Sequence, residues 1–235
     1  MQRPVPDPTI VGATPGPGGT SHVLPAGCSS ARRTWTGSAR PAGLDCGSWV
    51  CGPSCDLRQA AERGRDTGAR PDWLTTGHVD LDNLTNAAFW ADYHDLDGTA
   101  LYFLPHLRAM PDRIGAALQA VADAPPGAVL FHCMGGRDRT GLLAMVLLAA
   151  AAVEPADIVD DYLETVRVRN AQAAAEHSHS AEPMLDRLCR AHRHSTESAF
   201  RAALDGLDVD EVLRRAGLDD ATITAVRTWR GRLPG

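Results

Sequence analysis

The segment "VLFHCMGGRDRTG", residues 129–141, joins an apolar stretch to a polar loop that contains two glycines. It runs directly into "LLAMVLLAAAA", residues 142–152, which is too short to span a bilayer and has the composition of a buried helix. The order of residue types predicts a buried strand ending near His132, a tight loop, and a helix that begins near Arg139. Such a loop at a helix N-terminus usually binds a ligand.

The glycines of the loop indicate the kind of ligand. Gly135 and Gly136 permit unusual backbone dihedrals and leave no side chain in the way, so the amides of residues 134–138 can point inward. The helix that follows adds the positive end of its dipole at the same place. These features together predict a cradle for an anion such as a phosphate group.

Cys133, Arg139 and Thr140 give this cradle a chemistry. A thiol at the mouth of an anion site is expected to have a lowered pKa, which would make Cys133 a nucleophile at neutral pH. The guanidinium of Arg139 can bind two phosphoryl oxygens at once, and the Thr140 hydroxyl can hydrogen-bond the sulfur and ease its departure. His132 is expected to fix the loop through hydrogen bonds. The predicted reaction is phosphoryl transfer to Cys133, followed by hydrolysis of the phosphocysteine.

His132-Cys133, five further residues and Arg139-Thr140 resemble the signature of the cysteine-based protein tyrosine phosphatases. The loop is similar to that of their bacterial, lipid-phosphatase-like subgroup, which reads HCxxGKDRTG. Arg137 stands where the subgroup has a lysine associated with lipid-phosphate recognition, and the chain contains no lysine at all. The resemblance implies an α/β fold with a small, mainly parallel central sheet flanked by helices, and phosphomonoester hydrolysis without a metal or cofactor.

The acid that protonates the departing oxygen has two candidates. Resemblance to the subgroup implies Asp138, inside the loop, whereas other family members use an aspartate on a separate loop. Asp82 is the alternative, because a strand is expected to end there near the site. Asp138 could instead be structural and orient the loop amides. The candidate catalytic residues are Cys133, Arg139, Asp138 and Asp82, and the candidate substrate-binding residues are Met134, Gly135, Gly136, Arg137 and Thr140.

The rest of the chain from Asp56 onward follows an α/β pattern. "TTGHVDLDN", residues 75–83, predicts a strand ending near Asp82, and residues 110–127 predict a helix with Pro111 in its first turn. Five further segments predict a helical C-terminal layer, with Asp208 and Asp220 as N-caps. These segments are residues 154–170, 182–192, 195–206, 208–218 and 219–231. Weaker family similarity extends to "DLRQAAER" (56–63), which resembles a DLR-x-x-x-E segment, and to residues 159–170 and 212–227.

Residues 1–55 are unlike the remainder. They are rich in proline and glycine and show neither strand nor helix periodicity, so they are predicted to be irregular or disordered, with the catalytic domain spanning residues 56–235. The family's opening strands are not recognisable there. A compensated frameshift in the coding sequence would explain this, since residues 27–35 and 49–55 read in another frame can yield those strands. The chain as written would then lack two strands beside the catalytic one and give a low soluble yield.

The charge and composition of the chain argue against some classes of function. A formal net charge of −6 with scattered basic residues argues against nucleic-acid binding, and no stable membrane anchor or signal peptide is recognisable. A cytoplasmic location is therefore expected, with free cysteines. Two groups of residues lack the spacing of a zinc site: Cys46, Cys51 and Cys55, and a second group of His177, His179, His192, His194 and Cys189. The second group is interpreted as a solvated segment.

The predicted function is that of a protein tyrosine phosphatase. Its substrate would be a phosphotyrosine-containing protein or another phosphomonoester. Two alternatives stay open: a phosphoinositide phosphatase, and an inactive pseudophosphatase that binds a phosphopeptide without turnover.

Overall fold

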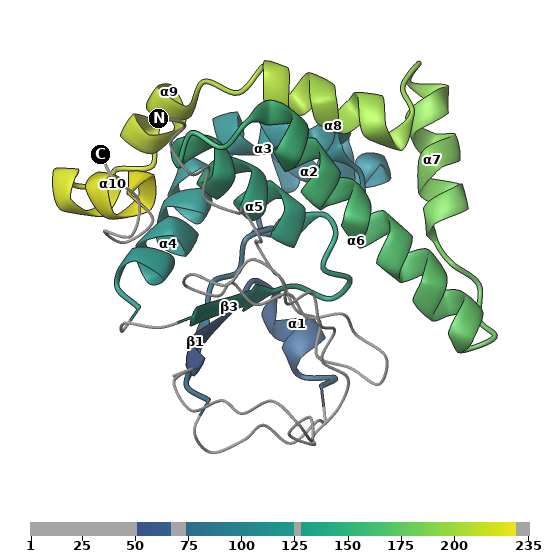
Figure 1. Cartoon of the computed structure of the whole chain (residues 1–235), viewed down its shortest axis with the longest axis horizontal. Helices are drawn as coiled ribbons and strands as arrows, with labels where there is room; N and C mark the ends of the chain where they lie inside the picture. The colour runs from purple at the N-terminus through teal and green to yellow at the C-terminus, as the bar shows by residue number, and fades with distance from the viewer. Residues whose placement is uncertain (1–50, 67–73, 125–127, 229–235) are drawn as a thin grey trace, which may run out of the picture.

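The computed structural model describes residues 51–66, 74–124 and 128–228. It contains a parallel three-stranded sheet of order β2-β1-β3, formed by β1 (Cys51–Asp56), β2 (Thr76–His78) and β3 (Ala128–His132). Figure 1 shows the helices from α2 onward gathered above the sheet, while α1 lies beside the strands, away from that layer. The predicted α/β class, with a small parallel sheet and a helical C-terminal layer, is confirmed.

The strands end at the same level, which places their C-terminal residues together. Asp56 of β1 is paired with His78 on one side and with His132 on the other. The pairing continues past the strands, because the backbone N–H of Leu57 donates to the carbonyl of His132 at 2.8 Å and that of Val79 donates to the carbonyl of Asp56 at 2.9 Å. The segments after β1 and β2 therefore lie next to Cys133.

The helices take up most of the remaining described chain. They are α1 (Ala60–Arg63), α2 (Ala87–Tyr93), the 3-10 helices η1 (His94–Leu96) and η2 (Ala100–Tyr102), α3 (Phe103–Ala109), α4 (Pro111–Ala122), α5 (Arg139–Ala150), α6 (Pro155–Ala175), α7 (Glu182–Ala191), α8 (Thr196–Asp205), α9 (Val209–Arg215) and α10 (Asp220–Arg227). None of the helices in the described ranges is long and apolar enough to cross a membrane.

Helix α5 is the centre of the core. Leu142, Leu143, Met145, Val146 and Leu147 are all fully buried, which explains why this helix is apolar on every side. Other helices of the layer, among them α4, α6, α9 and α10, contact it. The loop that follows β3 thus leads into a helix that is packed on all sides, which holds the first turn of α5 in place.

Several element boundaries differ from the sequence-based expectations. β2 ends at His78 rather than near Asp82, because the chain turns there and the N–H of Asn83 bonds the side chain of Asp80 at 3.0 Å. The N-cap of α10 is Asp219, whose carboxylate accepts from Thr222, and not Asp220. Asp208 caps α9 as predicted.

Residues 51–55 are not irregular, which corrects the expected boundary at Asp56. They form β1, the middle strand of the sheet, and Ser54 and Cys55 are buried between β2 and β3. Periodicity missed this strand because Gly52, Pro53 and Ser54 form no apolar run and include residue types that strands disfavour, so its place in the sheet depends on pairing with β2 and β3. The expectation that the written chain lacks a strand beside the catalytic one is therefore wrong for this stretch. Residues 27–35, the other part of the frameshift hypothesis, lie outside the described residues.

Candidate active site

Cys133 lies directly after β3 and is fully buried in the loop that precedes α5. The backbone N–H of Gly136 points at its sulfur, with a distance of 3.2 Å from N to Sγ. Thr140 lies close to the thiol and opposes the rise in its pKa, although the buried Oγ1 of Thr140 makes no hydrogen bond within the described residues. The Gly136 amide is therefore directed at the sulfur, as expected for a loop that would hold an anion there.

The two loop glycines are needed for different reasons. Gly136 has a φ of +67°, in the left-handed region that favours glycine. At Gly135 the constraint is space, because a Cβ would lie 2.5 Å from Nη1 of Arg169. Met134, between Cys133 and this pair, is 47% exposed at the surface of the loop.

Arg139 is held by carboxylates from two other segments. Its Nη1 and Nη2 atoms donate to the two carboxylate oxygens of Glu62, at 2.5 and 2.8 Å, and Nη1 lies 3.1 Å from Oδ2 of Asp82. A fork-to-fork pair of this kind fixes the plane of the guanidinium. Glu62 was not predicted as a site residue, although it is the glutamate of the DLR-x-x-x-E similarity, and that similarity is the signal that could have found it.

Asp138 has two roles in the geometry. Its Oδ1 accepts from the N–H of Arg139 at 2.8 Å, so it caps α5, and the same oxygen lies 3.7 Å from Sγ of Cys133. Its other oxygen accepts from the hydroxyl of Tyr102 at 3.5 Å. Asp138 therefore has the structural role considered above, because it caps α5. The same carboxylate still lies next to the sulfur of Cys133.

Asp97 is a further carboxyl group at the site. It follows η1, on a segment to which the sequence patterns assigned no element, and its side chain hydrogen-bonds that of Asp138. Two carboxyl groups can share a hydrogen bond only if one of them carries a proton. No local sequence signal marks Asp97, because its partner is 41 positions away in the chain and the contact depends on the fold.

The acidities of these groups are strongly shifted. Burial raises the pKa of Asp82 to about 8 despite the nearby Arg139, whose charge is already engaged by Glu62. Burial and then Asp138 raise the pKa of Asp97 to about 6. The pKa of Asp138 is lowered although burial opposes this, because Arg139 and its backbone N–H stabilise the anion.

The pKa of the Cys133 thiol differs from the expectation based on the sequence. Burial, and after it the charge of Asp138, raise the pKa of Cys133, which outweighs the opposing effects of Arg139 and Thr140. The prediction of a lowered pKa is wrong for this arrangement. The loop amides and the helix dipole favour the thiolate, but the sulfur is removed from water and lies beside the Asp138 carboxylate, and these two effects disfavour the thiolate more strongly.

Residues 52–229 match the group of sequences described as the tyrosine phosphatase family. The matched region starts in β1, contains the loop from His132 to Gly141, and runs through α10. The chain belongs to the tyrosine phosphatase family.

Two curated relatives resemble a shorter stretch of this tyrosine phosphatase family member. A tyrosine-protein phosphatase of Nostoc commune is 52% identical over 44 residues, which are 19% of this chain and 15% of that protein. A putative tyrosine-protein phosphatase of Cupriavidus necator is 54% identical over 44 residues, or 19% of this chain and 16% of that protein. The similarity therefore spans less than a fifth of the length of either relative.

Arg137 of this family member does not project over the sulfur. Its Nε donates to Oε2 of Glu182 at 2.7 Å, its Nη1 donates to the carbonyl of Gly98, and its guanidinium lies 5.6 Å from the ring centre of Tyr162. The side chain is only 3% exposed. Its side chain is turned away from the sulfur because Glu182, the carbonyl of Gly98 and the ring of Tyr162, on three other segments, surround its guanidinium.

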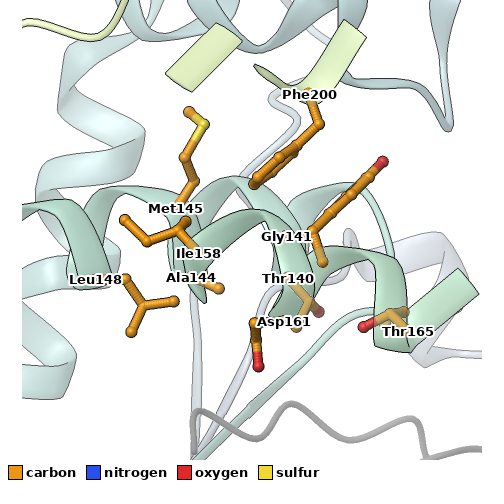
Figure 2. Close-up of a pocket in the computed structure, with 11 residues that line it drawn as sticks. Thr140, Gly141, Ala144, Met145, Leu148, Ile158, Asp161, Thr165 and Phe200 are labelled. Carbon is orange, nitrogen blue, oxygen red and sulfur yellow. The ribbon is translucent and has the colours of Figure 1, made fainter. Parts of the chain in front are cut away.

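The pocket in Figure 2 lies between α5, α6 and Phe200 of α8, next to the loop that precedes α5. Gly136, Thr140 and Gly141 contribute to its lining from the loop side, whereas Cys133 and Arg139 do not. Its walls are mainly apolar, and Figure 2 shows Met145, Ile158 and Leu148 along it. It is a gap between packed helices, beside the candidate active site.

The other cysteines and the histidine group stand apart from this site. Cys55 and Cys189 are buried free thiols, and burial raises the pKa of Cys55 to about 12. His177, His179 and His192 are exposed, and within the described ranges no cluster of three or more metal-ligating side chains occurs. Cys46 lies outside the described residues.

Proposed function

We propose that the protein is a protein tyrosine phosphatase that hydrolyses phosphomonoesters through a phosphocysteine at Cys133. The observation that carries this proposal is the Gly136 amide directed at Sγ of Cys133, in a loop that leads into the N-terminus of α5 within a matched tyrosine phosphatase region. A phosphoryl group placed there would meet inward amides, the N-terminus of α5 and, after exchange of partners, the fork of Arg139.

In the first step the sulfur attacks phosphorus, the bond to the ester oxygen breaks, and that oxygen takes a proton. The thiol must first lose its own proton, and the raised pKa of Cys133 in this arrangement makes this loss part of substrate binding. A bound phosphate dianion can accept the proton, so that the thiolate forms beside Arg139. In the second step water attacks the phosphocysteine, and Thr140 stabilises the departing thiolate.

For the acid we propose Asp138, supplied with its proton by Asp97. Asp138 is the carboxylate nearest to Sγ, at 3.7 Å, and the negative charge of a bound phosphate would raise its pKa. Its hydrogen bond to Asp97 provides a proton one step away. Asp82 is the competing candidate, since it keeps a proton at neutral pH but is paired with Arg139.

Phosphotyrosine is the proposed substrate class, in preference to phosphoinositides. A ring with several phosphates requires cations beyond the loop to bind them, and Arg137, the residue in the subgroup's lysine position, is bound by Glu182 and Gly98. A pseudophosphatase is disfavoured because Cys133, Arg139 and the surrounding carboxylates are all in place.

Release of phosphate from an aryl phosphate in the presence of a chelator tests the proposal. We expect the wild-type chain to turn over, and Cys133→Ser to lose activity while keeping its thermal transition. Turnover that persists in Cys133→Ser, or that disappears with the chelator, would contradict a cysteine mechanism. A preference for inositol lipids over phosphotyrosine peptides would instead support the alternative substrate.

A further inference from the structure

A buried carboxylate links two arginines behind the catalytic loop. Glu182, the first residue of α7, is 4% exposed, and its two oxygens accept from Nε of Arg137 and from Nε of Arg169, each at 2.7 Å. Arg137 belongs to the loop, whereas Arg169 comes from α6. Figure 1 shows α6 and α7 at one edge of the helical layer, where they approach each other at the lower right and diverge from there.

Arg169 also reaches the loop backbone. Its Nη1 donates to the carbonyl oxygen of Gly135 at 2.7 Å, and the guanidinium lies so close that a Cβ on Gly135 would collide with it. The loop is therefore tied to Glu182 twice: once through the side chain of Arg137, and once through Arg169 and the Gly135 carbonyl.

The second tie determines the direction of an amide in the site. In a trans peptide the C=O of one residue and the N–H of the next lie in one plane and point in opposite directions. Arg169 holds the C=O of Gly135 on the outer side of the loop, so the N–H of Gly136 must point to the inner side. There it meets Sγ of Cys133 at 3.2 Å.

We infer that Arg169 and Glu182 are positioning residues of the phosphatase reaction, which act by keeping the Gly136 amide turned toward the phosphoryl group. Arg169 grips the carbonyl on the other side of the peptide, and Glu182 orients the guanidinium of Arg169. The inference rests on the proposed function for its effect on turnover, but its effect on oxyanion binding does not require turnover.

Burial explains why the carboxylate is essential to this arrangement. Arg137 is nearly completely buried, and removal of a partner from such a charge is strongly destabilising. Glu182 variants are therefore expected to lose stability as well as activity, so they cannot by themselves distinguish positioning from folding. Arg169 is 26% exposed and can lose its contacts without leaving a buried charge unpaired.

The test compares Arg169→Met with Arg169→Lys and with Arg167→Met. Arg167 is on the same helix, is 60% exposed and pairs with Glu164 at 2.7 Å, so its variant removes an arginine from α6 without touching the loop. For each full-length variant we would measure the thermal transition, the steady-state kinetics with an aryl phosphate, and the binding of orthovanadate by calorimetry.

For Arg169→Met we expect kcat/KM to fall about 10-fold or more and orthovanadate affinity to fall with it, because one preorganised donor is no longer held. The thermal transition should stay close to that of Arg167→Met, and Arg169→Lys should recover part of the loss by bonding the carbonyl alone. Wild-type affinity and kinetics in Arg169→Met would overturn the inference.

Different results would refute the proposed function and the positioning role of Arg169 and Glu182. Wild-type protein that binds orthovanadate without turnover would refute the proposed function, and the affinities of the Arg169 variants would still decide the positioning role. Wild-type protein that does not bind orthovanadate would contradict both.

Discussion

Four carboxyl groups surround one arginine at the catalytic loop. Glu62 and Asp82 contact Arg139 directly, Asp138 caps the helix that Arg139 begins, and Asp97 hydrogen-bonds Asp138. Negative charge exceeds positive charge around this arginine, where Asp82 and Asp138 are buried while Asp97 is exposed, and this excess favours protonation of part of the group. The raised pKa values of Asp82 and Asp97 express this at the scale of single residues.

The first prediction separates the candidate acids. With a substrate whose leaving group is a poor one, Asp138→Asn should lower kcat by about 10² to 10⁴. Wild-type kcat/KM should fall as pH rises through about 6, the pKa of Asp97, because the proton is then lost from the pair in the free enzyme. Asp97→Asn should move this fall to lower pH. A profile that is unchanged in Asp97→Asn and abolished in Asp82→Asn would identify Asp82 as the acid.

The second prediction concerns stability and Asp82. Its pKa is about 8 in the folded protein against an ordinary value of 3.8, so the folded state binds this proton more tightly. The resulting stabilisation is complete below pH 4 and is lost as pH rises toward 8. Asp82→Asn should therefore gain in free energy of unfolding relative to wild type over that range.

Urea unfolding at several pH values checks this. Asp205→Asn, at an exposed position at the end of α8, is the matched control. A difference between Asp82→Asn and wild type that does not change from pH 4 to pH 8 would show that the Asp82 carboxyl is ionised throughout.

At the scale of elements, the packing of α4 against α9 depends on one glycine. A Cβ on Gly115 would lie 2.5 Å from the carbonyl oxygen of Ala216, just after α9. Gly115→Ala should lower the free energy of unfolding by about 1–2 kcal/mol, because overpacking exceeds the gain in helix propensity. Activity of the folded fraction should be unaffected.

Gly64→Ala is the control for the Gly115 variant. Gly64 follows α1 with a φ of −63°, and a Cβ there would make only ordinary contacts. This substitution should be neutral or slightly stabilising. Equal thermal transitions for Gly64→Ala and Gly115→Ala would contradict the tight approach of α4 and α9.

The helices, strands and loops that could be predicted from the sequence are those with strong local sequence patterns. The loop between β3 and α5, the helix after Pro111 and the C-terminal helices follow from periodicity, glycines and capping residues. The segment between Leu84 and Met110 gave no such signal, and it forms α2, η1, η2 and α3, which are short and bury aromatic residues. β1 was missed because its stability comes from pairing with two neighbours, which local patterns do not record.

At the scale of the whole molecule, the site residues that escaped prediction come from distant parts of the chain. Cys133, Arg139 and Asp138 are adjacent in sequence and were recognisable together. Asp97 and Glu182 meet the loop only because the sheet and helical layer bring their segments to it. Such contacts depend on tertiary structure, and one sequence contains no record of them.

The extent of the folding unit gives a prediction at this scale. We propose that residues 51–235 suffice for the fold, so a chain starting at Cys51 should keep the thermal transition and kcat/KM of the full chain. A chain starting at Leu57 should fail to fold, since it lacks the strand that pairs with both β2 and β3. A folded and active chain from Leu57 would show that β1 is dispensable.

The phosphocysteine is the central claim, and its direct detection is the decisive measurement. Full-length protein is mixed with an aryl phosphate, quenched in acid within one turnover, digested and analysed by mass spectrometry. We predict that the peptide carrying Cys133 gains the mass of one phosphoryl group, and that Asp138→Asn and Thr140→Ala alter how much accumulates. Turnover with no phosphoryl group on Cys133 at any quench time, or with one on another residue, would contradict the account.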